Sequence, residues 1–416
     1  MVKETYIVRN REINLSISAG EINSVIKKSI TQSACRAYDN GCIGVAGKLG
    51  EADEELMAQA VRNLKLQIPY EPEATSGMVR QEDWQNRLLN NRSSSGEAFT
   101  VENNSGFLKE AEEVLDILKK EYPQFIFSNK IRLSEISKQL RNDAGTDLHF
   151  SDRLMSFELL VKHAESVSVF DDTLVYVTRR PDRETFLKEA RERLDAFLNP
   201  LPLPKENVLP MIVMPSAFGE FLFQNLDALA MGRGTSFFNG KLGQKLFDEK
   251  FSFYVDRGSE ALGTAFFDAE GSTCENDRCY LIQNGVLVRP FADKKLGKEF
   301  GFENTATAGG AYDSVPSNTD ICFSIESSGQ TLKELMGEKD GIYISVMSGG
   351  DFTSEGNFAS PVQTAYLYHG GKLVGKLPEF NVSGNIYDIF GENFAGVSSD
   401  RAYEGDFKMV VKMKIQ

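Results

Sequence analysis

The chain has 416 residues, 41% of them hydrophobic and 25% charged, which is a globular composition with enough apolar material for two cores. Asp and Glu outnumber Lys and Arg by 60 to 46, and the formal net charge of −14 disfavours nucleic acid as a partner. The sequence contains no apolar run long enough to span a membrane, and the polar opening MVKETYIVRNREI is not typical of a secretory signal. The odd, sparse count of five cysteines argues against a disulfide framework and favours a cytoplasmic location.

Residues 1–199 are predicted to form an N-terminal α/β-type domain, a sheet with helices. Alternating apolar residues predict strands over 5–19 and 22–49, the second run being broken by an Asn40-Gly41 hairpin turn. The spacing of apolar residues predicts three helices and further strands, with the helices over 51–66, 107–122 and 183–198 and the strands over 125–142 and 147–178. The polar stretch 70–104 has little periodicity and is expected to be a loop.

A proline-rich segment, NPLPLPKENVLP, marks the expected boundary before a second domain over 205–416. One helix is predicted over 218–229, and the rest of this domain is predicted to consist mostly of short strands between Gly, Asn and Asp. Asn284-Gly285 and Gly370-Gly371 are typical of tight hairpin turns. The expected fold class is therefore α+β, with a mainly antiparallel, barrel-like C-terminal domain that has few helices.

The residues do not suggest a metal site. The three histidines, His149, His163 and His369, lie far apart in the sequence, so that no helix presents two imidazoles to one ion. Cys274 and Cys279 have a spacing that zinc ligands can have, but no second Cys/His pair accompanies them, and a hairpin loop with two free thiols is favoured.

Two motifs, one for nucleophilic catalysis and one for phosphate binding, are also missing: the sequence has no G-x-S-x-G and no phosphate loop. Acidic side chains remain as candidates. Glu220, Asp256, Asp268 and Glu270 could line a cleft as paired carboxylates. Alternatively, the acids in glycine-flanked turns accept hydrogen bonds from backbone amides.

An ordered series of segments resembles the TldD/PmbA (TldD/TldE) family, also called modulators of DNA gyrase. The series includes FGEFLFQNLDAL, FFDAEGS, LIQNGVLVRPF, GIYISVMSGGDFTSEGNF and FNVSGNIYDIF in the second half, with weaker similarity in YDNGCIGVAG and NDAGTDLHFSDRLMSFELLV. The resemblance implies a peptidase-related fold in which one kind of subunit binds zinc through His-Glu-x-x-x-His and a cysteine near the C-terminus.

On that motif, Gly219 and Gln224 stand where the two histidines would be, Glu220 matches the glutamate, and residues 398–416 contain no cysteine. Glycine has no donor and a neutral amide is a poor zinc ligand. The resemblance therefore implies a metal-free PmbA/TldE-like subunit without a cofactor or catalytic residue of its own. Its partner would be a TldD-like zinc peptidase subunit, or a second copy of itself, and the pair would act on peptides.

The substrate would lie against a sheet edge, with this chain forming one wall of the chamber. The residues expected in this cleft are Glu220, Ser236, Asp268, Glu270, Gly349, Gly350 and Asp351. Two alternatives stay open: a self-sufficient, metal-independent hydrolase that uses its carboxylates, and a non-enzymatic peptide-binding or regulatory protein.

Overall fold

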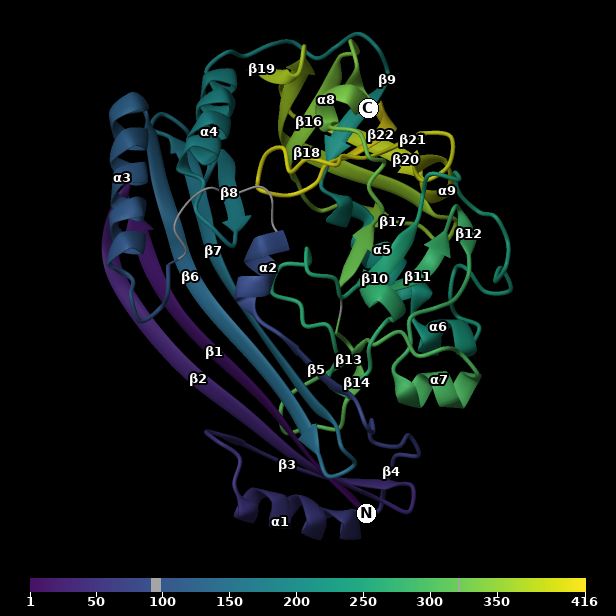
Figure 1. The fold of residues 1–416 in the computed structure, drawn as a ribbon. Coiled ribbons are helices and arrows are strands. Elements are labelled where there is room, and N and C mark those ends of the chain that lie inside the picture. The colour runs from purple at the N-terminus through teal and green to yellow at the C-terminus, as the bar shows by residue number, and fades with distance from the viewer. Residues whose placement is uncertain (91–98, 321) are drawn as a thin grey trace.

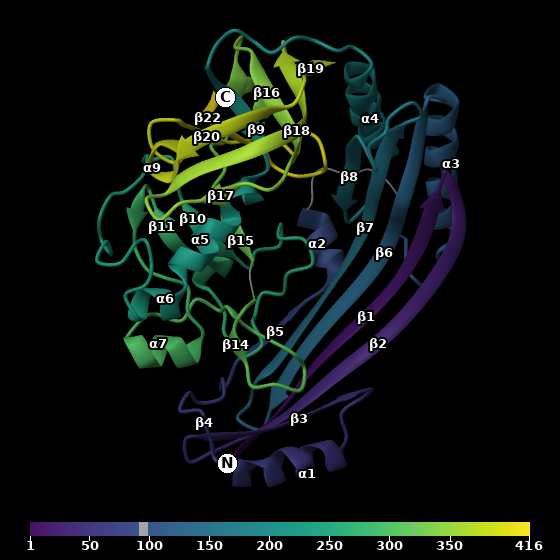
Figure 2. The ribbon, with the colours of Figure 1, turned by 180° about the vertical axis from the view of Figure 1, so that it is seen from behind.

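The structure is a computed structural model that describes residues 1–90, 99–320 and 322–416. It is α+β, as predicted, with a long curved sheet along one side and a barrel-containing C-terminal part packed against it (Figure 1). The N-terminus lies at one end of the long axis and the C-terminus at the other (Figure 2). In the described ranges, no helix is long and apolar enough to cross a membrane.

The N-terminal sheet is built around four strands of 17 to 19 residues, β1, β2, β6 and β7. Its order is β4-β3-β2-β1-β6-β7, with β8 and β5 also beside β7. Every pairing is antiparallel except that of β5 with β7. The strands are β1 (Val2–Ser18), β2 (Glu21–Asp39), β3 (Cys42–Leu49), β4 (Ile68–Pro69), β5 (Val79–Glu82), β6 (Phe125–Asn142), β7 (Asp147–His163) and β8 (Asp172–Thr178).

Helices cover this sheet where its apolar residues would otherwise face water. Helices α3 (Ser105–Glu121) and α4 (Arg183–Phe197) bury their apolar faces on the upper end of the sheet in Figure 1, together with side chains of β1, β6, β7 and β8. Helix α1 (Glu54–Asn63) closes the opposite end. Gly44 of β3 permits that contact, because a Cβ there would lie 2.1 Å from the carbonyl oxygen of Ala60.

Five strands of the C-terminal part close into a barrel. The ring runs β16-β9-β22-β20-β18 and returns to β16, and only the β9–β16 pairing is parallel. These strands are β9 (Val208–Val213), β16 (Gly341–Met347), β18 (Asn357–His369), β20 (Phe380–Asn385) and β22 (Met409–Ile415). Added at its margins are β17 (Asp351–Phe352), β19 (Lys372–Lys376), β21 (Phe394–Val397), α8 (Leu332–Met336) and α9 (Ile386–Ile389).

A second, smaller sheet lies beside the barrel. Its order is β12-β11-β10-β15, and a separate two-stranded ribbon, β13 with β14, lies nearer the long sheet. The bounds are β10 (Phe253–Asp256), β11 (Arg278–Gln283), β12 (Val286–Leu287), β13 (Ala308–Gly309), β14 (Ser317–Asn318), β15 (Phe323–Ile325) and α7 (Lys294–Phe300). One apolar core joins this sheet to the barrel and is rich in phenylalanine.

The N- and C-terminal parts are joined by apolar clusters and by buried ion pairs. Phe266 and Phe267 pack on Leu140, Leu148 and Phe150 of the long sheet. At the upper end, a hydrophobic cluster combines α4 with barrel residues. The segment 198–207 connects α4 to β9. Within it, Pro200 forms an isolated parallel β-bridge with Lys376.

The structure confirms the three predicted hairpin turns and corrects several element boundaries. The first residue of each turn pair has a positive φ, as the tight turn requires: 48° at Asn40, 49° at Asn284 and 60° at Gly370. The 51–66 helix is shorter and ends in the 3₁₀ turn η1 (Leu64–Leu66).

The stretch 70–104 is not only a loop. It contains β5 and α2 (Trp84–Asn90), and part of it, 91–98, lies outside the described residues. Strand β5 was missed because its four residues, VRQE, have no apolar alternation and are held by pairing with β7.

Candidate functional site

The predicted 218–229 helix is divided in two. It begins as the 3₁₀ turn η2 (Pro215–Phe218), continues as α5 (Gly219–Leu226), and stops where Asp227 becomes extended. The Asp227 carboxylate then accepts a hydrogen bond from Leu229 N at 3.1 Å and starts α6 (Ala228–Gly232). The break explains why the apolar spacing misleads here: a capping aspartate competes with helix continuation.

Helix α5 buries one side and presents the other to a groove. Phe221, Leu222 and Leu226 are buried in the C-terminal core, whereas Glu220 and Gln224 are exposed. These two side chains are bonded to each other, with Gln224 Nε2 donating to Glu220 Oε1 at 3.1 Å. Gly219, one residue before Glu220, has open space where a Cβ would be.

The groove has a volume of about 530 Å³ and runs between α5, the segment after α6, and β17. Aromatic rings form its apolar wall, with centroid separations of 4.4 Å for Phe221–Phe352 and 5.2 Å for Phe218–Phe358. Its polar lining includes Glu220, Gln224, Asp351 and Thr353.

Strand β17 forms the wall opposite α5 and ends the barrel sheet. In the part of the chain that the structure describes, it pairs only with β18, through Asp351↔Ala359 and Phe352↔Phe358. The two preceding glycines fit this placement. Gly349 has a φ of +83°, and a Cβ on Gly350 would lie 2.5 Å from Ser360 Cβ. The Ser-Gly-Gly-Asp segment therefore holds an edge strand tightly against β18.

Five of the seven expected cleft residues lie at or beside this groove. Glu220, Ser236, Gly350 and Asp351 line it, and Gly349 precedes Gly350 on the same wall. The Ser236 hydroxyl is committed to local structure, since it donates to Asn225 O at 2.6 Å and accepts from Phe238 N at 2.9 Å. The Ser236 hydroxyl therefore stabilises the local backbone and is not available as a nucleophile.

Asp268 lies outside the groove and stabilises a turn. Its carboxylate accepts hydrogen bonds of 2.9 Å from the backbone N–H groups of Glu270, Ser272 and Ala308. Burial raises the pKa of Asp268. This arrangement is the backbone-capping alternative considered for acids in glycine-flanked turns.

Glu270 also lies outside the groove, in the contact between the N- and C-terminal parts. It is 2% exposed, accepts from the Tyr70 hydroxyl and from Lys294 N at 3.0 Å, and burial raises its pKa to about 7. The structure therefore does not gather Glu220, Asp268 and Glu270 into one carboxylate site.

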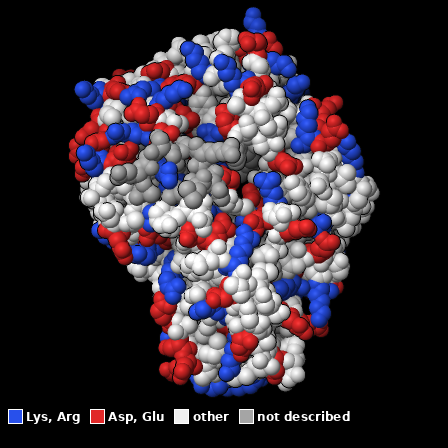
Figure 3. Space-filling view, viewed as in Figure 1, with Lys and Arg blue, Asp and Glu red and all other residues white. Residues whose placement is uncertain are grey.

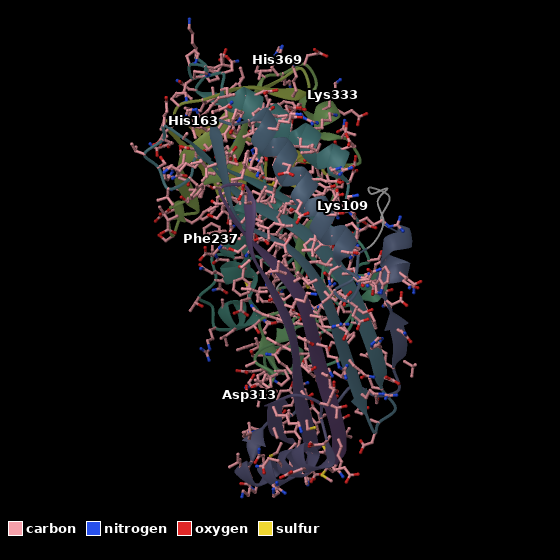
Figure 4. The ribbon with its side chains drawn as sticks, turned by 90° about the vertical axis from the view of Figure 1, so that its left-hand side faces the viewer. Lys109, His163, Phe237, Asp313, Lys333 and His369 are labelled. Carbon is pink, nitrogen blue, oxygen red and sulfur yellow. The ribbon has the colours of Figure 1, made fainter. Side chains whose placement is uncertain are left out.

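The side chains near α5 do not fit a zinc ion. Gly219 offers no donor, and the Gln224 amide is bonded to Glu220. Among the described residues, no group of three His, Cys, Asp or Glu could hold a metal. His163 and His369 lie towards one end of the long axis, well away from Phe237 of the groove (Figure 4).

Sequence reasoning missed the aromatic wall of the groove. Phe218, Phe221, Phe237, Phe352 and Phe358 line it. The available signal was the phenylalanine content, 29 residues, and the repeated Phe in FGEFLF and SFF. Their convergence could not be read from the sequence, because they come from three separate segments.

Comparison with known proteins gives a consistent result. Residues 206–411 match the model of the PmbA/TldA metallopeptidase C-terminal domain. An uncharacterised protein of Methanocaldococcus jannaschii is 27% identical over 190 residues, 44% of each chain. A metalloprotease of Archaeoglobus fulgidus is 24% identical over 408 residues, 92% of this chain and 88% of that one.

The crystal structure of TldE from Thermococcus kodakarensis shares the fold, with a TM-score of 0.75 and 19% identity, over 100% of this chain and 96% of that one. The first of the sequence matches covers less than half of its relative, whereas the fold match covers nearly all of both chains. The domain match, the relatives and the fold agree with the order of motifs in the second half, and the chain belongs to the PmbA/TldD family.

Proposed function

We propose that this chain is a zinc-less, peptide-binding subunit of a two-subunit, cytoplasmic metallopeptidase of the TldD/TldE type, with zinc supplied by the partner subunit. The observation that carries the proposal is the state of α5. Gly219 and Gln224 occupy the positions of the two histidines in the family motif, and Glu220 is bonded to Gln224 at 3.1 Å. A glutamate held by a neighbouring amide has no metal-bound water to activate.

The groove supports the peptide-binding part of the proposal. Its one wall is an edge strand, whose outward backbone groups can pair with an added extended chain. Phenylalanine rings from both walls are available to an apolar side chain, with Glu220 and Asp351 among the polar lining residues. Backbone pairing tolerates many sequences, while the rings and carboxylates would favour an apolar residue next to a basic one.

The charge distribution is compatible with a protein or peptide partner. On the face shown in Figure 3, Lys and Arg are interspersed with Asp and Glu and form no single basic stripe. A duplex nucleic acid requires such a stripe to neutralise its phosphates.

The decisive experiment measures zinc content and peptide cleavage for the purified chain, alone and mixed with a His-Glu-x-x-x-His subunit from the same family. The expected result is substoichiometric zinc and no cleavage alone, and chelator-sensitive cleavage with the partner. Stoichiometric zinc in the isolated chain would refute the proposal. Cleavage by the isolated chain that survives a chelator and is lost in Glu220→Gln would instead establish the carboxylate hydrolase.

Peptide binding is tested separately by fluorescence anisotropy with a labelled, unstructured peptide that contains an aromatic residue next to an arginine. Phe352→Ala should weaken binding at least about tenfold, in line with the roughly 1.5–3 kcal/mol expected for burying a large apolar side chain. Phe300→Ala is the matched control, since Phe300 is also half-buried but lies on α7, outside the groove lining. Equal binding by the two variants would exclude the groove as the peptide site.

A further inference from the structure

Two cysteines lie together beneath a second, polar cavity on the small sheet. Cys274 and Cys279 flank the 3₁₀ turn η3 (Glu275–Asp277) and are 5% and 9% exposed. The two thiols are close enough for each to shift the pKa of the other, and Cys274 Sγ donates a hydrogen bond to Thr305 O at 3.4 Å. Cys279, but not Cys274, lines the cavity, which has a volume of about 850 Å³. Cys279 is therefore the thiol of the pair that a small solute in the cavity can reach.

The surroundings distinguish the two thiols chemically. The neighbouring Cys274 thiol lowers the pKa of Cys279, and the guanidinium groups of Arg289 and Arg257 act in the same direction. The Cys279 side chain and burial both raise the pKa of Cys274. A thiol of lowered pKa on the cavity side, next to a second thiol of raised pKa, is the arrangement of a reactive cysteine with a resolving cysteine.

The turn between the cysteines is held in a conformation that keeps them close. Asn276 and Asp277 have φ values of 52° and 59°, in the left-handed region that side chains seldom adopt. Both Asp277 carboxylate oxygens accept from Arg80 of β5 at 2.7 Å, and Asp277 O accepts from Arg257 N at 2.8 Å. The chain thus reverses sharply, so that Cys274 comes back beside Cys279.

We infer that Cys274 and Cys279 form an oxidation-sensitive dithiol, which a hydroperoxide converts into a disulfide. The Cys279 thiolate attacks one peroxide oxygen, the O–O bond breaks, and the departing oxygen leaves as water, or as an alcohol from an organic hydroperoxide, after taking up a proton. Cys279 is then a sulfenic acid. Cys274 attacks the Cys279 sulfur, its proton goes to the leaving hydroxyl, and a water molecule departs. Two thiols are oxidised to one disulfide and one peroxide is reduced.

The test uses the full chain, treated with hydrogen peroxide, alkylated to block free thiols and digested with trypsin without reductant. Cleavage after Arg278 separates the cysteines into the peptides 258–278 and 279–294, the second continuing past Arg289 because Pro290 follows it. A disulfide joins these peptides into one species, two hydrogens lighter than their sum. The expected result is conversion of most of the chain to this species and its complete loss on addition of a dithiol reductant.

The same digest contains a matched control, because Arg36 likewise separates Cys35 from Cys42, which are placed on paired strands. Burial raises the pKa of Cys35 to about 11. Cys35 and Cys42 should therefore resist oxidation by peroxide and be recovered as alkylated cysteines. In Cys274→Ser, Cys279 should accumulate sulfinic and sulfonic acid at least severalfold over wild type, because nothing resolves its sulfenic acid. The inference is overturned if Cys274 and Cys279 remain free thiols at peroxide concentrations that oxidise Cys42, or if Cys279 pairs with Cys322 instead.

Discussion

Replacing Asp172 by asparagine should weaken the contact between the long sheet and the barrel more than any exposed charge change. Asp172, the first residue of β8, is 1% exposed and accepts hydrogen bonds from the hydroxyls of Ser345 and Tyr366 on the barrel strands. Its Oδ2 lies 3.0 Å from Arg193 Nε, and Arg193 is 3% exposed. Arg193 also reaches Glu404 at 3.0 Å.

The size of the effect follows from these contacts. Removing one partner of a buried ion pair costs about 3–5 kcal/mol, since the remaining charge stays buried. Glu404 still compensates Arg193 in the variant, which places the loss near the lower end, about 3 kcal/mol. The asparagine NH2 group would also point donor hydrogens at neighbouring groups that donate to Asp172, which lowers the stability of the variant further.

The assay is urea unfolding, monitored by far-UV circular dichroism and by tryptophan fluorescence. Trp84 is the single tryptophan of the chain and lies in α2, with the Arg153 guanidinium 3.7 Å from the centre of its ring. The matched control is Glu121→Gln, which breaks an exposed bidentate pair with Arg191 at 2.7 and 2.9 Å. That control should lose less than about 1 kcal/mol. A loss below about 1 kcal/mol for Asp172→Asn, or one equal to that of the control, would show that the buried network does not hold the two parts together.

Three further predictions concern turns and titration. Gly285→Ala should lower the free energy of unfolding by at least about 2 kcal/mol more than Gly41→Ala in the same urea assay. Both glycines have φ near +75°, but only at Gly285 would a Cβ meet backbone, 2.2 Å from Phe247 O. Equal losses of stability in the two variants would contradict the steric reasoning. Gly350→Ala should weaken peptide binding in the anisotropy assay by pushing β17 off Ser360, with a stability loss of about 1–3 kcal/mol, and unchanged binding would separate β17 from the peptide site. Burial raises the pKa of Glu270 to about 7, above its unfolded value, so the folded state binds the proton more tightly, and the free energy of unfolding should decrease by up to about 3 kcal/mol as the pH rises from about 4.5 to 7. Glu270→Gln should remove only part of this pH dependence, because burial also raises the pKa of Glu189 to about 7. An unchanged pH dependence in Glu270→Gln would mean that Glu270 does not titrate in this range.

Several features of the fold could be predicted because they depend on local chemistry. The Asn-Gly and Gly-Gly turns need residues that tolerate positive φ, and the long strands alternate apolar and polar side chains over many residues. Helices α3 and α4 have apolar residues at helical spacing and could be placed to within one or two residues. The absence of an imidazole at positions 219 and 224 is likewise a property of the residue types alone.

Other features depended on contacts between distant segments. Strand β5 forms only because β7 offers an edge, and the helix over 218–229 is broken because Asp227 caps the next turn. Asp268 and Glu270 belong to one short turn in the sequence, yet the tertiary structure uses the first as a backbone acceptor and buries the second against Tyr70.

The sequence by itself therefore determined which chemistry α5 can perform, since a helix without imidazoles at positions 219 and 224 lacks them in any fold. Only the tertiary structure decided where a ligand could bind. It placed β17 opposite α5, brought phenylalanines from three segments into one groove, and set Cys274 near Cys279. The physical reason is that side-chain chemistry is local, whereas a groove is made by surfaces whose residues are far apart along the chain.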